Sequence, residues 1–266
     1  MIKFFRKIRQ NQIMKNKTGK YFKYAIGEIV LVVMGILIAL SINNWNLNRI
    51  NSNLEQQYFV RLLEDLKEEK AIMQATTNYS VEVHSHAEKA MLIFEDPEKH
   101  NEDSVESLID LYQASQLQTP ASAKSTYQEL IASSQINLIK NDSLKTSLIR
   151  YYEYNWTKAT AVNLPNDYRA NIRSKMPNAI QAEIRSKCGD IYVKIRKTYE
   201  VTLPKECDIN ISKNVADPIV ELLRHDVELK KDLRVLIGNV EAKLEFINSL
   251  KKQLEELINQ FEDNLQ

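Results

Sequence analysis

The sequence predicts a mainly α-helical protein, in which an N-terminal transmembrane helix is followed by a helical bundle. Three observations lead to this fold class. One long apolar run lies near the N-terminus, apolar residues recur at helical spacing through most of the remaining chain, and the 266 residues include only 5 glycines and 6 prolines. We expect a basic head over 1–24, a transmembrane helix over 25–45, and a helical domain on the far side of the membrane over 46–266. The bundle is predicted to end in a long heptad-patterned helix and to include one small β-hairpin near 191–203.

The formal net charge of +1 is the sum of a basic head, the single charge of Glu28 and an acidic body. Residues 1–24 carry eight Lys and Arg side chains and no acidic residue, whereas residues 29–266 carry 28 basic and 34 acidic residues. Because basic residues stay on the cytoplasmic side of a membrane span, the N-terminus is predicted to be cytoplasmic and the body to lie outside. A basic run beside a span also suits an anionic lipid surface, and we expect no nucleic-acid partner.

The first element is the apolar segment Ala25–Ile42 (AIGEIVLVVMGILIALSI), whose 18 residues carry one charge, on Glu28. At about 1.5 Å per residue, a helix of this length spans about 27 Å, close to the hydrocarbon core of a bilayer. Tyr21, Tyr24 and Trp45 flank the segment, as aromatic side chains do at membrane interfaces. The segment is therefore predicted to be a transmembrane helix anchored by these three residues.

Two other interpretations of the segment stay open. One is a buried helix of a soluble core, which the lack of a polar face disfavours; the other is a signal peptide cleaved after Ser41.

Glu28 is interpreted either as a proton relay or partner contact, or as a carboxylate that extends to the headgroups, which we favour. Gly35 and Ala39 form a small-xxx-small step that suggests close packing of two such helices.

The body is predicted to be helical. Apolar spacing predicts a long helix over 50–94, which ends before a proline. Asp103 begins a capping box for a short helix to about Gln116, another short helix opens at Ser125, and Asn141 or Asp142 caps a longer one. The frequent acidic pairs on these helices are interpreted as a solvated surface.

The last helix has the clearest pattern. Eleven of the thirteen a and d positions from Ile219 to Phe261 are apolar, the exceptions being Asp226 and Lys243. Several e positions are apolar as well, so the stripe is wider than a two-stranded coiled-coil seam. We expect this helix to start at Asp217-Pro218 and to pack antiparallel to the helix over 50–94.

One segment departs from the helical pattern. Apolar residues alternate from Ile191 to Leu203, which predicts a strand or a small hairpin. Cys188 and Cys207 flank it. They are predicted to form a disulfide in an oxidising periplasm, and to be free thiols if the body is cytoplasmic.

Two blocks of the sequence resemble a known family. They are KYFKYAIGEIVLVVMGILIALSINNWN (Lys20–Asn46) and STYQELIASSQINLIKNDSLKTSLIRYYEYN (Ser125–Asn155). Both are similar to a family of single-pass membrane proteins of unknown function common in Bacteroidota. The resemblance implies a bacterial inner-membrane protein with a periplasmic body. Gln135 stands where relatives often carry a glycine after the serine pair, so a glycine-based tight turn is not expected at this position.

The sequence excludes several familiar kinds of active site. No two glycines lie closer than eight residues, so glycine-rich phosphate loops and nucleophile elbows are absent. Glu82, His84, His86 and Glu88 suggest a metal site, but no metal-binding motif accompanies them, and we interpret them as an exposed helix face. We therefore expect no catalytic, cofactor-binding or metal-binding residues.

Two further groups of residues are candidates for function. Tyr151, Tyr152, Tyr154 and Trp156 suit either a ligand pocket or, as we favour, core packing. Ser104 and Ser143 each follow an aspartate in a three-residue pattern that resembles an O-glycosylation signal, although both positions also suit helix caps.

Three classes of function follow. The leading hypothesis is a non-enzymatic, membrane-anchored scaffold or protein-interaction module. The alternative is a periplasmic ligand-binding or sensory module that acts through a partner, and the third class is an enzyme whose site the spacing does not reveal. The expected partners are the lipid bilayer and either another membrane or periplasmic protein or a second copy of the chain.

Overall fold

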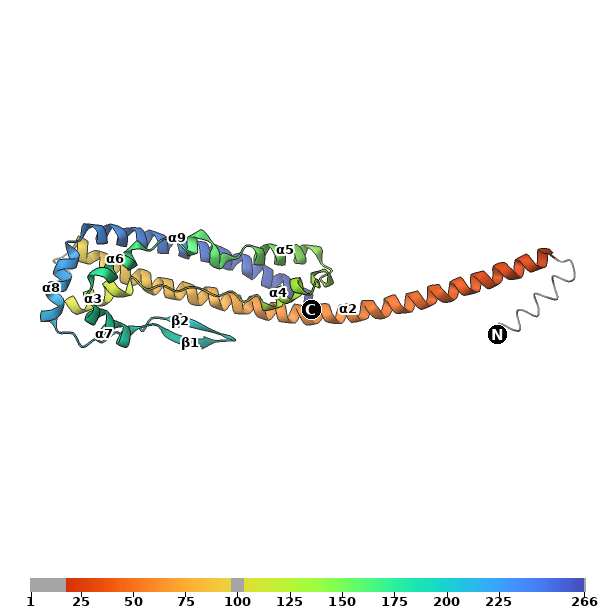
Figure 1. Ribbon diagram of the computed structural model, residues 1–266, viewed down its shortest axis with the longest axis horizontal. Helices are drawn as coiled ribbons and strands as arrows, with labels where there is room; N and C mark the ends of the chain where they lie inside the picture. The colour runs from red at the N-terminus through yellow and green to blue at the C-terminus, as the bar shows by residue number, and fades with distance from the viewer. Residues whose placement is uncertain (1–17, 97–102, 266) are drawn as a thin grey trace. The chain divides into compact units, whose positions relative to one another are not determined.

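The computed structural model describes residues 18–96 and 103–265 (Figure 1). Most of the predicted basic head therefore lies outside the described residues, as does the side chain of Tyr21. The described residues form eight α-helices, three short 3-10 turns and one two-stranded sheet. The predicted fold class, with a long N-terminal helix and one small hairpin, is confirmed. The chain divides into two compact units between Gln57 and Tyr58.

Helices account for most of the secondary structure, and the one sheet lies between two of them in the sequence. In chain order, the helices are α2 (Thr18–Glu95), α3 (Ser104–Gln113), α4 (Ser125–Ala132), α5 (Asp142–Glu153), α6 (Asp167–Lys175), α7 (Asn178–Cys188), α8 (Lys213–Arg224) and α9 (Val227–Leu265), with strands β1 (Ile191–Ile195) and β2 (Thr198–Thr202) between α7 and α8.

The first unit contains the apolar part of α2. Its most apolar 18-residue stretch has a mean hydropathy of 2.6, and none of that stretch is buried. By length and composition this helix is able to cross a membrane.

The second unit is built on α2 and α9, which run antiparallel as the sequence predicts (Figure 1). Ion pairs join them in opposite sequence order: Glu95 with Arg234, Lys70 with Glu255, and Lys67 with Glu262. These exposed pairs contribute little energy. The apolar faces between the pairs bury the side chains that hold the two helices together.

Two hydrophobic cores lie along this helix pair. The first, which we call the α4–α5 core, combines Tyr58–Met73 of α2 with α4, α5, Trp156 and the last part of α9. The second, which we call the disulfide core, combines the end of α2 with α3, α6, α7, α8 and the first half of α9. Each core thus uses the same two long helices and a different set of short ones.

The predicted caps of α3 and α5 are confirmed. The Asp103 carboxylate accepts hydrogen bonds from the backbone N–H groups of Val105 and Glu106, at 3.0 and 3.2 Å. The Asn141 side chain accepts one from Leu144 N, at 3.1 Å. In both cases a side-chain oxygen satisfies a donor at the first turn that has no partner within the helix.

The predicted start of the last helix is wrong. Pro218 lies inside α8, and the heptad pattern is divided between α8 and α9. The break comes at Asp226, whose carboxylate accepts a hydrogen bond from Leu229 N at 2.9 Å and so caps α9. Leu222, a predicted d position, is 72% exposed because it belongs to α8, which packs differently. The charged interruption of the heptad was therefore a helix boundary.

The two strands form an antiparallel hairpin, in which Tyr192 pairs with Val201 and Ile195 with Thr198. The two-residue turn puts odd-numbered residues of β1 and even-numbered residues of β2 on the same face. The alternation in the sequence therefore does not mark one apolar face. Ile191 and Val193 lie on one face of the hairpin, whereas Tyr199 and Val201 lie on the other.

The serine pair after α4 forms a tight turn without glycine. Ser134 has a φ of 57°, in the left-handed region, and Gln135 N donates to Leu130 O at 2.9 Å, closing the helix end. This 6→1 hydrogen bond is typical of a Schellman motif, in which the left-handed residue is usually glycine. The turn that relatives make with a glycine thus forms here without one, since Ser134 adopts the conformation that a glycine favours.

Candidate functional site

The predicted membrane residues lie on the exposed first unit. Tyr24 and Trp45 are 63% and 64% exposed, and the guanidinium of Arg49 lies 5.4 Å from the centre of the Trp45 ring. Gly35 and Ala39 are exposed too, and a Cβ added at Gly35 meets no atom within 4 Å. The small-residue face is thus open to another helix.

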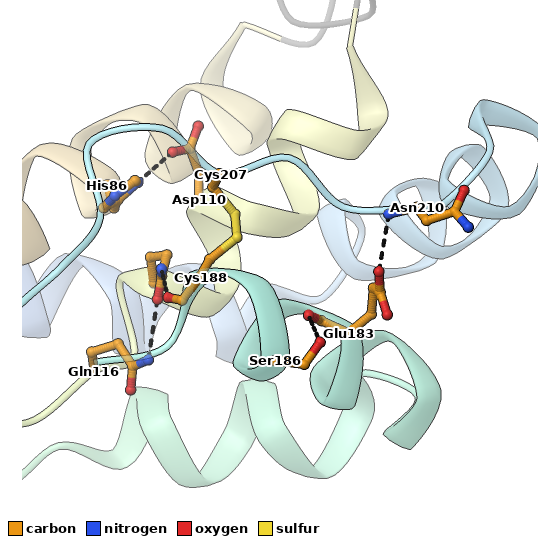
Figure 2. Close-up of a disulfide and its surroundings, with 9 residues drawn as sticks. His86, Asp110, Gln116, Glu183, Ser186, Cys188, Cys207 and Asn210 are labelled. Atoms are coloured by element: carbon orange, nitrogen blue, oxygen red, sulfur yellow. Dashed lines mark hydrogen bonds and ion pairs between the residues drawn. A yellow bond between two sulfur atoms is a disulfide. The ribbon is translucent and has the colours of Figure 1, made fainter. Parts of the chain in front are cut away.

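The structure joins Cys188 and Cys207 in a disulfide (Figure 2). Cys188 ends α7 and is fully buried in the disulfide core. Its carbonyl oxygen accepts a hydrogen bond from Gln113 Nε2 at 2.6 Å, and Gln116 donates in turn to Gln113 at 3.1 Å. The start and end of the hairpin segment are therefore fixed to the body at one place.

The tip of the hairpin is fixed by α2. Arg196 pairs with Glu64 at 2.7 Å and with Glu68 at 3.4 Å, and Lys197 N donates to both Glu68 carboxylate oxygens at 3.2 Å. Arg196 has a φ of 42°, a conformation that costs a non-glycine residue about 1 kcal/mol. These contacts with Glu64 and Glu68 offset that cost.

Between these attachments β1 is exposed, whereas β2 is largely half-buried, with Val201 packed against Tyr79 and Val83 of α2. Tyr192 is 69% and Tyr199 65% exposed, and Ile191 and Val193 are 44% and 40% exposed. By the register, Tyr192 and Tyr199 lie on the same face of the sheet, in diagonal positions. The second unit thus presents large apolar side chains on a firmly attached two-stranded sheet.

Buried carboxylates on α2 fix the segment before α4. Glu69 is completely buried and accepts hydrogen bonds from Trp156 Nε1, from Ala123 N, and from Ser122 Oγ at 2.9 Å. Burial raises the pKa of Glu69, and the three hydrogen bonds oppose this effect only in part. One side chain thus satisfies donors from two separate segments.

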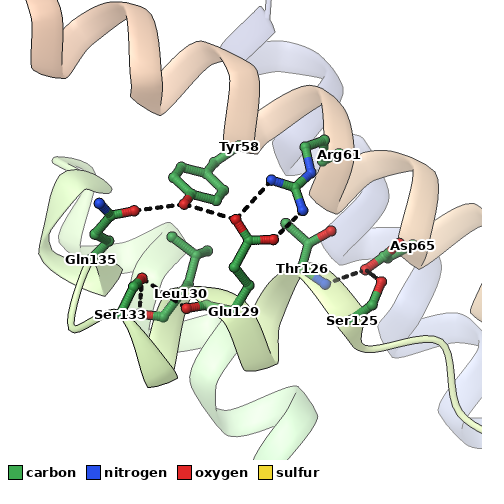
Figure 3. Close-up of polar contacts among 9 residues, drawn as sticks. All are labelled: Tyr58, Arg61, Asp65, Ser125, Thr126, Glu129, Leu130, Ser133 and Gln135. Atoms are coloured by element: carbon green, nitrogen blue, oxygen red, sulfur yellow. Dashed lines mark hydrogen bonds and ion pairs between the residues drawn. The ribbon is translucent and has the colours of Figure 1, made fainter.

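Asp65, one turn earlier, caps α4 from outside its own helix (Figure 3). Its carboxylate accepts from Thr126 N at 2.7 Å and from Ser125 Oγ at 3.1 Å. The residue at the α4 N-cap position makes no such bond with its own side chain. The first turn of α4 therefore depends on α2.

The other end of α4 meets α2 as well. Tyr58 donates to Gln135 Oε1 at 2.6 Å and to Glu129 at 3.1 Å, and Arg61 forms a bidentate ion pair with Glu129 (Figure 3). The second block that resembles the known family is thus the one that docks on α2. Gln135, which departs from the family pattern, makes one of these bonds.

The interpretation of the acidic pairs as a solvated surface is wrong at this place. Asp65, Glu68 and Glu69 are at most 8% exposed. The sequence contained a signal, since Asp65 and Glu69 lie three residues after Leu62 and Leu66, on the edge of the apolar face of α2. It did not indicate the donors, which come from the loop at 122–126, from Trp156 and from the hairpin turn.

The two histidines of the cluster contact different carboxylates. His84 lies 3.5 Å from Glu88 and 3.3 Å from Glu241, whereas His86 Nδ1 lies 2.7 Å from Asp110 (Figure 2). In the described part of the chain, no three His, Cys, Asp or Glu side chains come together as a metal would require.

The aromatic residues after α5 pack in different ways. Tyr152 is buried, stacks on Tyr127 with 4.7 Å between the ring centres, and donates to Ala123 O. Trp156 is buried beside Glu69. Tyr151 and Tyr154 instead line an open groove of about 540 Å³ between α5 and α9.

The two serine candidates differ in accessibility. Ser104 is 8% exposed, and its hydroxyl donates to Asp217 of α8. A glycan there would have to displace α8. Ser143, in the first turn of α5, is exposed and accessible to modification.

A second, smaller cavity lies between α2, α9 and the connecting segments 116–118 and 161–166. It measures about 60 Å³, and Lys243 of α9 lines it. Burial lowers the pKa of Lys243, and no carboxylate pairs with it among the described residues. Ser80 Oγ, Gln118 Oε1 and Asn166 Nδ2 are buried, line the same cavity, and have no hydrogen-bond partner in the described structure. The single charged interruption within α9 thus faces a group of unsatisfied polar atoms.

Comparison with known proteins places this architecture in a family. A family of unknown function, DUF6090, matches residues 28–175, from the apolar part of α2 to the end of α6. The chain belongs to this family. The match covers the α2 carboxylates, the α4–α5 block that docks on them, and most of the apolar segment. No curated protein and no solved structure matches the chain.

Proposed function

We propose that this DUF6090 protein is a non-enzymatic protein-interaction module held at the bacterial inner membrane by one span, with its N-terminus in the cytoplasm and its body in the periplasm. The observation that carries the proposal is the β1–β2 hairpin, which is fixed at both ends and exposes strand β1 and Tyr199 between them. Exposed strands with apolar side chains are templates for a further strand from another protein.

The hairpin is prepared for such binding in two respects. The disulfide joins its flanking residues, and Glu68 with Glu64 holds its tip, so a partner does not have to order it. The large exposed side chains, Tyr192 and Tyr199, are of the kind that contributes most to protein interfaces.

The placement at the membrane has separate support. The apolar stretch of α2 is unburied, and basic residues precede it. The Cys188–Cys207 disulfide suits an oxidising compartment, which the periplasm provides.

Topology is tested with reporter fusions at the C-terminus of the full chain. We expect an alkaline phosphatase fusion to be active and a green fluorescent protein fusion to be dark. Acidic replacement of the basic residues in 1–24 should reduce this asymmetry. A dark phosphatase fusion beside a bright fluorescent one would contradict the placement.

The interaction is tested with photo-crosslinking residues placed at Tyr192 and Tyr199 in living cells, with exposed Lys252 of α9 as the matched control position. We expect one discrete adduct from both hairpin positions and none from position 252. The same adduct should disappear in a Val193→Lys variant, because a charge on an exposed strand opposes pairing. An adduct that forms equally at all three positions would refute the hairpin as the interaction surface.

A further inference from the structure

The cavity at Lys243 has properties that neither a scaffold nor a membrane anchor requires. Its lining residues include one lysine and no Asp or Glu, so its formal charge is positive. A partly buried ammonium group without a carboxylate partner is costly, and proteins normally pair or replace it.

The hydroxyl group of Ser80, which lines the cavity, does not make the hydrogen bond that nearby hydroxyl groups of α2 make. Thr76 and Thr77 in α2 each donate their hydroxyl to the carbonyl oxygen four residues earlier, at 2.9 Å. Ser80, only one turn further and 3% exposed, makes no such bond, so its hydroxyl is available to the cavity.

Asn166 is oriented by its role as a helix cap. Its Oδ1 accepts from Arg169 N at 3.0 Å, which identifies the buried, unpartnered atom as the Nδ2 donor. Beside it, Asn239 donates to Pro165 O at 3.1 Å, which ties α9 to the segment before α6. Donors from α2, from the N-cap of α6 and from α9 therefore line the cavity.

We propose that this cavity binds a small monocarboxylate of two or three carbons, with its carboxylate on Lys243, Ser80 and Asn166. A cavity of about 60 Å³ suits a molecule of a few heavy atoms, and acetate has four. The walls contributed by Val83, Leu236 and Val240 suit a short alkyl group. The unpaired Gln118 Oε1 is an acceptor that suits a hydroxyl on the carbon next to the carboxylate, as in glycolate or lactate.

The inference does not depend on the membrane placement or on the hairpin, so its failure would leave the proposed function standing. The test measures binding of isotopically labelled acetate to the purified full chain in detergent by equilibrium dialysis. We expect saturable binding of one acetate per chain, competition by propionate and lactate, and no competition by acetamide, which has the same shape without the charge.

Three variants complete the test. Lys243→Met replaces the charged side chain with an apolar one of similar length. We expect at least tenfold weaker acetate binding with an unchanged or higher melting temperature. Asn166→Asp maintains the α6 cap while adding a repelling charge, and should weaken binding as strongly. Lys252→Met, at an exposed position of the same helix, should bind acetate as the wild type does. Equal binding of acetate and acetamide, or wild-type binding by a folded Lys243→Met variant, would overturn the proposal.

Discussion

The two cores of the second unit use the same pair of long helices and hold their short helices in different ways. In the α4–α5 core, buried carboxylates of α2 accept hydrogen bonds from residues of the loop at 122–126. In the disulfide core, Cys188 and Cys207 are covalently joined. A disulfide acts mainly by restricting the unfolded chain, whereas a buried carboxylate acts only while every donor it satisfies is in place. The first core should therefore be the more sensitive to single substitutions.

The largest effect is expected from Glu69→Ala. Removal of this carboxylate leaves Trp156 Nε1, Ala123 N and Ser122 Oγ without their acceptor. At about 1–3 kcal/mol for each buried donor, less what water restores, we expect a loss of about 4 kcal/mol in the free energy of unfolding. Urea unfolding of the full chain in detergent, followed by Trp fluorescence, measures it.

Glu69→Gln is the matched control for that substitution. It retains one acceptor oxygen and nearly the same volume, so it should lose about half as much stability. A Glu69→Ala variant as stable as the wild type would show that the carboxylate does not hold the 122–126 segment.

The disulfide core is tested by Cys188→Ala together with Cys207→Ala. The two cysteines are 19 residues apart, and closing a loop of this length stabilises a protein by about 3 kcal/mol in the chain-entropy model. We expect that loss in urea unfolding, with the m-value increased because the unfolded chain is less compact. A double variant with wild-type stability and m-value would contradict the entropic account.

The difference between the cores also explains what the sequence could predict. The caps at Asp103 and Asn141 were predictable because donor and acceptor lie within three residues of each other. Glu69 was not, because its three donors lie more than fifty residues away. In the sequence, the helix boundary at Asp226 was visible only as a charged residue at an apolar heptad position. Lys243 is also a charged residue at such a position, but it lines a cavity instead. Periodicity identifies both positions without distinguishing a helix boundary from a buried charge.

A smaller effect is expected at the turn after α4. Ser134 has a φ of 57°, which a glycine adopts without steric cost. We expect Ser134→Gly to stabilise the protein by about 0.5 kcal/mol, since the relief of strain exceeds the added freedom of the unfolded chain. The melting temperature measures this, with Ser133→Gly as the control, because Ser133 has a φ of −86° and should lose stability instead.

The smallest effect distinguishes the cores by pH. Burial raises the pKa of Glu69 above its ordinary 4.5, so at pH values just above 4.5 the folded chain binds a proton more tightly than the unfolded chain does. The stability that comes from binding this proton is lost as the pH rises through that interval. In the disulfide core the hydrogen bond from Lys175, and then that from Leu229 N, lowers the pKa of Asp226 below 3.8. Its contribution is present above that pH and is lost as pH falls below it. Plotted against pH, the stability difference between wild type and Glu69→Gln should therefore fall with rising pH, and that between wild type and Asp226→Asn should rise. If both stability differences changed with pH in the same direction, the opposite pKa shifts of Glu69 and Asp226 would be contradicted.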